Sequence, residues 1–154
     1  LQVLTSVDHV NDRQKTIMLD KVERKFGKNL SGLTFSVWGL AFKPQTDDMR
    51  EAPSIRIIEG LLARGARVRG CDPEALETAR EALDDRVELV ADQYDCLEGA
   101  DGLILVTEWN EFRRPDFKRM KTLLKKPVVF DGRNVFAPDR MREMGFEYDC
   151  IGRA

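Results

Sequence analysis

The chain has 154 residues, of which 42% are hydrophobic and 34% charged, and its net charge at pH 7 is −2. This size is typical of one globular domain, and the composition excludes a disordered chain. The near-neutral charge gives no basic field for nucleic acid, and no apolar run reaches the roughly 18 residues of a membrane span. We therefore expect neither nucleic acid nor a membrane among its partners. Three widely spaced cysteines without a C-x-x-C pair, and the lack of a signal peptide, predict a cytoplasmic location.

A helix is predicted over residues 6–26, because Met18, Val22 and Phe26 fall on one i, i+4 row. A helix of some 20 residues is about 30 Å long, which is long for the first element of a small domain. We interpret residues 1–30 as the end of a linker helix. The chain also lacks an initiator methionine, so we expect a fragment or a processed form of a longer protein.

Apolar strands alternate with amphipathic helices after residue 30. Strands are predicted at 33–40, 67–71, 87–90, 102–107, 127–130 and 148–151, helices at 54–64, 74–83, 115–124 and 138–144, and a helical turn at 95–99. The alternation predicts βαβ units with a parallel sheet, and the nearly continuous apolar first and fourth strands are typical of strands buried on both faces. We therefore predict an α/β domain at 31–154. Its fold is a doubly wound, Rossmann-like parallel sheet with helices on both faces, preceded by the long N-terminal linker helix.

Four polar clusters directly follow predicted strands, at 42–50, 72–73, 108–109 and 131–134. In an open α/β sheet, ligands bind beyond the carboxyl ends of the strands, where the strand order reverses. The first, fourth and fifth strands are neighbours in a doubly wound sheet, so their loops are expected to converge on one cleft. The first loop lacks the G-x-G-x-x-G spacing of a dinucleotide fingerprint.

The first loop carries two cations and two acids. Lys43 follows the strand directly, where its charge either contacts a phosphate or sugar oxygen or is solvated. Arg50 lies near a helix start, where the helix dipole disfavours a cation. Its position indicates either a ligand or partner, or an ion pair with Asp47 or Asp48. For these two aspartates, turn capping and pairing with nearby cations are favoured over acid–base chemistry.

The other strand ends offer three candidate groups. Asp72 either binds a ribose hydroxyl, as the acid after the second strand does in dinucleotide folds, or caps the next helix, and the second interpretation is favoured. Trp109 either stacks on a ring or covers the sheet edge. Gly132 lets the backbone approach a ligand, and Arg133 beside it offers a bidentate contact to a carboxylate or phosphate. The alternative for Arg133 is a tight turn with an exposed arginine.

Catalytic machinery is not expected in this chain. His9 is the only histidine and lies far in sequence from every strand end, so neither a nucleophile–histidine pair nor a metal cluster is predicted. We interpret Cys71, Cys96 and Cys150 as core residues. The residues by themselves therefore predict a domain that binds an anionic ligand.

The segment Gly39–Pro53, Gly-Leu-Ala-Phe-Lys-Pro-Gln-Thr-Asp-Asp-Met-Arg-Glu-Ala-Pro, closely resembles a signature of the UDP-glucose/GDP-mannose dehydrogenase family. It is the signature of that family's nucleotide-sugar-binding domain. Segments 107–112 and 130–134 resemble two further family motifs in the same order, and segment 10–14 resembles the end of the helix that joins the family's two α/β domains. The resemblance covers nearly the whole chain, and it is strongest to the members that oxidise UDP-glucose to UDP-glucuronate.

The resemblance implies a role for four residues. Phe42, Lys43 and Arg133 match positions that bind the nucleotide sugar, and Arg50 matches an arginine that reaches NAD, which is bound mainly by a domain absent from this chain. The family oxidises the sugar to its uronic acid through a cysteine in a segment that is also absent here. No catalytic residue is therefore assigned, and the fragment alone is expected to be inactive.

The implied partners are UDP-glucose or UDP-glucuronate, the NAD-binding domain of the same enzyme, and a second copy of the full-length protein in a homodimer. The motifs leave open two alternatives. The first is the corresponding domain of a dehydrogenase for GDP-mannose or UDP-N-acetylmannosamine. The second is a non-catalytic nucleotide-binding or dimerisation module.

Overall fold

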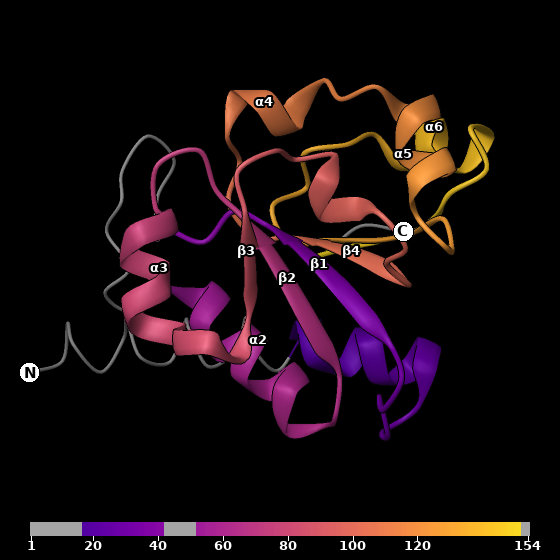
Figure 1. The fold of residues 1–154 in the computed structure, drawn as a ribbon. Helices are drawn as coiled ribbons and strands as arrows, with labels where there is room; N and C mark the ends of the chain where they lie inside the picture. The colour runs from indigo at the N-terminus through magenta and orange to yellow at the C-terminus, as the bar shows by residue number, and fades with distance from the viewer. Residues whose placement is uncertain (1–16, 42–51, 152–154) are drawn as a thin grey trace, which may run out of the picture.

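The computed structural model describes residues 17–41 and 52–151, and these form a six-stranded parallel sheet covered by helices (Figure 1). The strands are β1 Thr34–Trp38, β2 Arg67–Cys71, β3 Glu88–Val90, β4 Gly102–Leu105, β5 Val128–Asp131 and β6 Glu147–Cys150. Their order in the sheet is β3-β2-β1-β4-β5-β6. The order reverses between β1 and β4, which is where such sheets bind ligands. The predicted doubly wound fold is confirmed.

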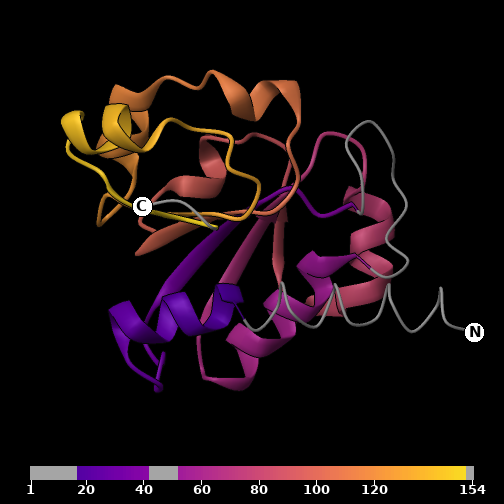
Figure 2. The ribbon, with the colours of Figure 1, turned by 180° about the vertical axis from the view of Figure 1, so that it is seen from behind.

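Helices cover the two faces of the sheet in separate groups (Figures 1 and 2). A helix over residues 17–26, α2 and α3 lie on one face, and η2, α4, α5 and α6 lie on the other. The bounds are α2 Pro53–Ala63, α3 Leu76–Leu83, α4 Asn110–Arg113, α5 Phe117–Leu123, α6 Pro138–Glu143, and for the 3-10 turns η1 Asp84–Arg86 and η2 Asp95–Leu97.

The side chains of β1 show how the sheet divides the core. Phe35 and Val37 point into the cluster under α2, whereas Trp38 points into the cluster under α4 and stacks on Phe112 at 4.9 Å between ring centroids. Because successive strand residues face opposite sides, a strand with apolar residues on both faces supplies both layers. β1 is therefore the centre of two hydrophobic cores.

The described part of the predicted N-terminal helix, residues 17–26, packs on the sheet. Met18 and Val22 are fully buried, and Phe26 meets the ring of Phe35 edge-on at 5.3 Å. Lys21 and Lys25 form ion pairs with β6, and Glu23 pairs with the arginine that follows α2. Residues 1–16 lie outside the described residues, and the division between linker and domain at residue 30 stays a prediction.

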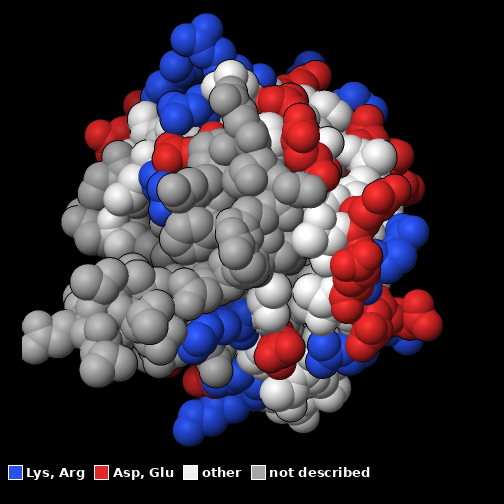
Figure 3. Space-filling model, turned by 90° about the vertical axis from the view of Figure 1, so that its left-hand side faces the viewer, with Lys and Arg blue, Asp and Glu red and all other residues white. Residues whose placement is uncertain are grey.

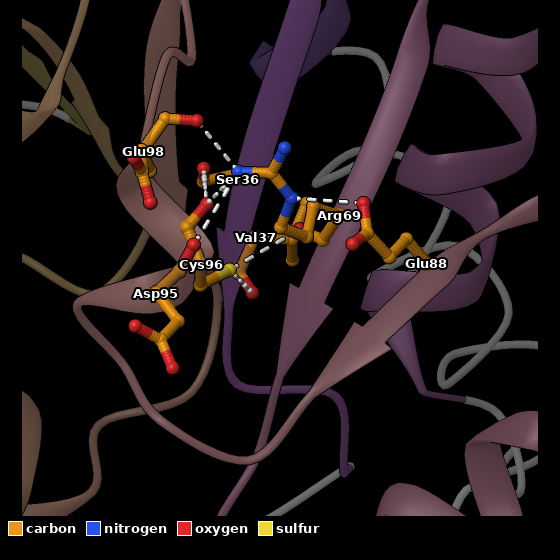
Figure 4. Close-up of polar contacts among 7 residues, drawn as sticks. All are labelled: Ser36, Val37, Arg69, Glu88, Asp95, Cys96 and Glu98. Carbon is orange, nitrogen blue, oxygen red and sulfur yellow. Dashed lines mark hydrogen bonds and ion pairs between the residues drawn. The ribbon is translucent and has the colours of Figure 1, made fainter.

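Arg69 on β2 ties the neighbouring strand β3 to the turn η2 (Figure 4). Its Nε donates to the Glu88 carboxylate at 3.1 Å, and its Nη1 donates to the carbonyl oxygens of Cys96 at 3.1 Å and Glu98 at 2.8 Å. The hydroxyl of Ser36 on β1 also donates to the Cys96 carbonyl. A cation at the end of a helical turn satisfies carbonyls that lack partners within the turn. We interpret this cluster as structural.

Most differences from the predicted elements lie at their ends. The first strand ends at Trp38, two residues earlier than predicted, because Gly39 has a left-handed φ of 94°. The predicted helix at 115–124 begins only at Phe117, where Asp116 caps it by accepting from the Arg119 N–H at 3.1 Å. The short helix α4 was not predicted.

None of the helices among the described residues combines the length and apolar character needed to cross a membrane. Figure 3 shows the charges on the face that lies to the left in Figure 1. Acidic side chains form a band along one side of it, and basic groups gather at its top and bottom. This mixture of signs agrees with the small net charge of −2.

Candidate functional site

The chain leaves β1 through a turn that is built against the end of β4. Gly39 donates its N–H to the Cys71 carbonyl at 2.8 Å, and its φ of 94° suits glycine. A Cβ atom at this position would stand 2.5 Å from the backbone nitrogen of Thr107. The Thr107 hydroxyl in turn donates to the Ala41 carbonyl at 2.7 Å. The carboxyl ends of β1 and β4 are therefore locked together.

Asp72, directly after β2, holds the same turn from the other side. Its Oδ2 accepts from the main-chain N–H groups of Leu40 at 2.8 Å and Ala41 at 3.1 Å, and its Oδ1 accepts from Glu74 and Ala75, both at 2.9 Å. The side chain is fully buried. The prediction that Asp72 caps the next helix is wrong, because the N-cap of α3 is Ala75. Asp72 instead closes a turn that precedes the helix and joins it to β1.

Trp109 is part of this arrangement rather than a platform for a ligand. Only 4% of the residue is exposed, and its Nε1–H donates to Oδ2 of Asp72 at 3.3 Å. Its ring packs in the core under α4. Trp109 therefore neither stacks on a ligand nor covers the sheet edge, the two roles that the sequence predicted. It is buried behind the ends of β1, β2 and β4.

The turn after β5 is organised by a second buried carboxylate. Asp131 accepts from the Arg133 N–H through Oδ1 at 2.9 Å, and through Oδ2 from the N–H groups of Val135 at 2.8 Å and Phe136 at 3.0 Å. The Tyr148 hydroxyl also donates to Oδ2, at 2.6 Å. A buried carboxylate with this many donors fixes the backbone around it.

Asn134 fixes the far side of the same turn. It has a φ of 55°, in the left-handed region that asparagine tolerates better than most residues. Its side-chain amide exchanges two hydrogen bonds with the backbone of Ile151, at 2.8 Å and 3.0 Å. Arg133 is thus held on both sides of its own backbone.

The side chain of Arg133 projects from this rigid turn and meets Glu108. Its Nη2 donates to Oε1 of Glu108 at 3.0 Å, while Arg113 donates from Nη2 to Oε2 of the same carboxylate, also at 3.0 Å. The side chains of Arg133, Glu108 and Arg113 are 42%, 28% and 51% exposed. The arrangement presents positive charge to solvent at the carboxyl ends of β4 and β5.

The structure brings together the loops predicted to converge. The loop after β4 contacts the loop after β1 through Thr107 and Ala41, and the loop after β5 through Glu108 and Arg133. The predicted substrate residues Phe42 and Lys43, and the predicted cofactor residue Arg50, lie outside the described residues, as do Asp47 and Asp48. Their roles stay predictions.

The described residues after β1 and β2 do not fit a dinucleotide. In that type of site the backbone after the first strand faces the pyrophosphate, and the acid after the second strand binds a ribose hydroxyl. Here the N–H groups of Leu40 and Ala41 are already bound to Asp72, and Asp72 is itself buried and engaged. Both parts of a dinucleotide site are thus used to hold the fold.

All three cysteines are buried, which confirms their prediction as core residues. Burial raises the pKa of Cys71 far above its ordinary value, and burial raises the pKa of Cys96 from 9.0 to about 12. Nucleophilic chemistry requires the thiolate, so neither side chain suits it. Within 17–41 and 52–151, no group of His, Cys, Asp or Glu has the makings of a metal site.

The sequence indicates the strand ends at which the site lies, but not the contacts that three residues make there. Thr107 and Asp131 were seen only as parts of motifs, and Glu108 was not linked to Arg133. The signal available for Glu108 was topological: it lies two residues after Val106, beyond the end of β4, and β4 pairs directly with β5. An acid and an arginine that follow paired parallel strands are candidates for an ion pair.

The chain is similar to known proteins over almost its whole length. Residues 36–138 match the family described as "UDP-glucose/GDP-mannose dehydrogenase family, UDP binding domain". The chain is 44% identical to UDP-glucose 6-dehydrogenase of Pseudomonas aeruginosa, with 99% of this chain and 35% of that protein covered. It is 43% identical to UDP-glucose 6-dehydrogenase of Rhizobium meliloti, with 94% and 33% covered.

A solved structure agrees with these matches. The UDP-glucose dehydrogenase of Pyrobaculum islandicum superposes with a TM-score of 0.76 at 36% identity, over 92% of this chain and 30% of that one. The chain spans about a third of the length of the curated relatives named above. On its sequence and its fold, it belongs to the UDP-glucose/GDP-mannose dehydrogenase family, whose UDP binding domain it contains.

Proposed function

We propose that this chain is the UDP-sugar-binding part of an NAD-dependent UDP-glucose 6-dehydrogenase, which oxidises UDP-glucose to UDP-glucuronate. Its own task is to hold the nucleotide sugar. The oxidation is carried out by residues that correspond to the two thirds of the relatives that this chain does not cover. The cytoplasm is the location we propose, because three buried thiols fit a reducing compartment.

The proposal rests on one observation above all, the position of Arg133. It projects from a turn fixed on both sides, at the carboxyl end of β5 and next to the point where strand order reverses. Ligands of open α/β sheets bind there, and a guanidinium suits diphosphate or carboxylate oxygens. Phe42 directly follows Ala41, which is held by both Asp72 and Thr107, so the predicted residues Phe42 and Lys43 begin at a firmly anchored point.

Calorimetric titration with UDP tests the binding role. The wild-type chain is expected to bind UDP, and Lys43→Ala and Arg133→Ala are each expected to weaken binding about tenfold, since a charge-assisted contact contributes roughly 1.5 kcal/mol. Arg114→Ala is the matched control, because Arg114 is exposed and has no ion pair within the described part of the chain. Equal affinity of wild type and both variants would remove Lys43 and Arg133 from the site.

The sugar-nucleotide class is tested by comparing UDP with GDP in one thermal-shift series. A larger rise in melting temperature with UDP is expected. A larger rise with GDP would favour a GDP-mannose dehydrogenase domain instead.

The cofactor belongs to the proposal in a limited way. We place NAD mainly on a region outside this chain, with Arg50 reaching it, because Asp72 and the turn after β1 are committed to the fold. The purified chain should therefore reduce no NAD when given UDP-glucose. Appearance of NADH absorbance at 340 nm would contradict this assignment.

A homodimer of the full-length protein completes the proposal. The predicted helix at 6–26 is the element we assign to dimerisation. Light scattering of this chain across a concentration series tests it, and a monomer at every concentration would remove that helix as a sufficient dimerisation element.

A further inference from the structure

Glu108 forms ion pairs with two arginines, Arg113 and Arg133, so its single negative charge does not fully neutralise their two positive charges. Each guanidinium gives it a single hydrogen bond from Nη2, at 3.0 Å. The three side chains together carry one net positive charge. The Nε and Nη1 groups of Arg133 donate to no other described residue, so that edge of the guanidinium is free for a ligand.

The turn fixes the backbone of Arg133, but it does not fix the conformation of the long Arg133 side chain. Asp131 and Asn134 set the direction in which the side chain leaves the turn. An arginine has several rotatable bonds, and ordering it on ligand binding costs conformational entropy. With 42% of its side chain exposed, Arg133 makes its described side-chain hydrogen bond to Glu108 alone.

We propose that Glu108 is a positioning residue for the nucleotide sugar, which orders the Arg133 guanidinium before the ligand binds. This inference rests on the proposed function. Arg113 also takes part, because its positive charge offsets the negative charge of Glu108, so that Arg133 can still attract an anion. Glu108 itself touches no ligand phosphate, since a carboxylate repels one.

Removal of Glu108 should change the affinity for UDP in the direction opposite to that expected from charge alone. Removing a negative charge beside an anion site strengthens anion binding when charge alone acts. If Glu108 works by ordering Arg133, its removal weakens binding although the site becomes more positive. The sign of the change therefore separates the two mechanisms.

The experiment is a calorimetric UDP titration of wild type, Glu108→Ala and Glu111→Ala. Glu108→Ala is expected to bind UDP about 3- to 10-fold more weakly, the factor that corresponds to the cost of ordering one long side chain. Glu111→Ala is the matched control, since Glu111 is an exposed acid on α4 without an ion pair among the described residues. Its affinity should be unchanged or slightly higher. Equal or tighter binding by Glu108→Ala would overturn the proposal.

A double-mutant cycle shows whether Glu108 acts through Arg133. In the background Arg133→Ala, the change Glu108→Ala should cause no further loss of affinity. A loss as large as in the wild-type background would contradict the positioning role. Glu108→Gln should fall between wild type and Glu108→Ala, because an amide oxygen still accepts a hydrogen bond from Arg133.

A readout without ligand separates this inference from the proposed function. Rotation of the Arg133 guanidinium, followed by NMR of ¹⁵N-labelled arginine side chains, should be slow in wild type and Glu111→Ala and fast in Glu108→Ala. If wild type binds no UDP, the proposed function fails by itself. Guanidinium rotation that is equally fast in all three proteins would overturn the positioning role whether or not UDP binds.

Discussion

Gly39 and Thr107 approach each other so closely that a Cβ atom on Gly39 would lie 2.5 Å from both the Cβ and the backbone nitrogen of Thr107. Gly39 directly follows β1, and Thr107 lies just beyond β4, so the contact joins the ends of the two strands between which the sheet order reverses. The predicted substrate loop begins three residues after Gly39. Its starting point thus depends on the absence of a side chain at one position.

Replacing Gly39 with alanine is therefore expected to be severe. The change Gly39→Ala combines a positive φ of 94° with an overlap against backbone that cannot move aside. We expect a loss of about 3 kcal/mol or more in the free energy of unfolding, measured by urea denaturation. Gly27→Ala is the control, because Gly27 has a similar φ of 91° but no atom within 4 Å of the added Cβ. It should cost only about 1 kcal/mol, from backbone strain alone.

Asp72→Asn should destabilise the chain although it preserves shape. An amide group presents N–H donors where Asp72 now accepts from four main-chain N–H groups. We expect a loss of about 3 kcal/mol in urea denaturation. Asp92 makes a comparable turn, accepting from Tyr94 and Asp95, but it is exposed. Asp92→Asn should therefore cost less than about 1 kcal/mol, and equal losses for the two variants would show that burial of Asp72 is not decisive.

Tyr148→Phe removes one donor from the carboxylate that organises the Arg133 turn. The Tyr148 hydroxyl and Asp131 Oδ2 are 2.6 Å apart and both buried. We expect a loss of about 1–2 kcal/mol, because the carboxylate stays buried with one donor fewer. Tyr94→Phe serves for comparison, since the Tyr94 hydroxyl accepts from the Asp116 N–H in an exposed setting. A larger loss for Tyr94→Phe than for Tyr148→Phe would contradict this account.

The pKa of Cys96 predicts a loss of stability at high pH. Its value rises from 9.0 to about 12 because the thiol is buried. The folded state therefore holds this proton more tightly than the unfolded state. The protonated thiol therefore contributes to the free energy of unfolding, fully below pH 9 and less and less as pH rises toward 12. At pH 10.5 the free energy of unfolding should be about 2 kcal/mol lower than at pH 7 because of this group.

Denaturant unfolding at pH 7 and pH 10.5, for wild type and Cys96→Ala, isolates this contribution. The other ionisable groups are the same in both proteins, so only the difference between the two pH profiles reports on Cys96. The stability of wild type should fall more steeply with pH than that of Cys96→Ala. Parallel pH profiles would rule out a contribution from this thiol.

Much of the fold was predictable because hydrophobic pattern and turn residues agree. The strands around Phe35 and Ile104 are mostly apolar, and glycines or prolines follow or precede most elements. The role of Asp72 as a helix cap was predicted wrongly because a capping aspartate and a turn-closing aspartate look alike in sequence. The five donors to Asp72 come from three separate segments, and only the folded chain brings these together.

The candidate site was predictable in place but not in its contacts. Arg133 was predicted at the end of a strand, either as a ligand contact or as an exposed turn residue, and the structure places it after β5, one strand away from the switch point between β1 and β4. Its pairing with Glu108 spans 25 residues of sequence. Such a contact follows from the pairing of β4 with β5 rather than from any local pattern. Phe42, Lys43 and Arg50 remain predictions, since they lie outside the described residues.

The helix over residues 17–26 is joined to two separate parts of the fold. It is fastened to β6 by Lys21 and Lys25 and to the end of α2 by Glu23, while its apolar face is buried in the core. The strand β6 is one edge of the sheet, whereas α2 connects β1 with β2 in the other half. Removing residues 17–26 would therefore break ion pairs to both of these elements and uncover the core cluster that Met18 and Val22 help to fill.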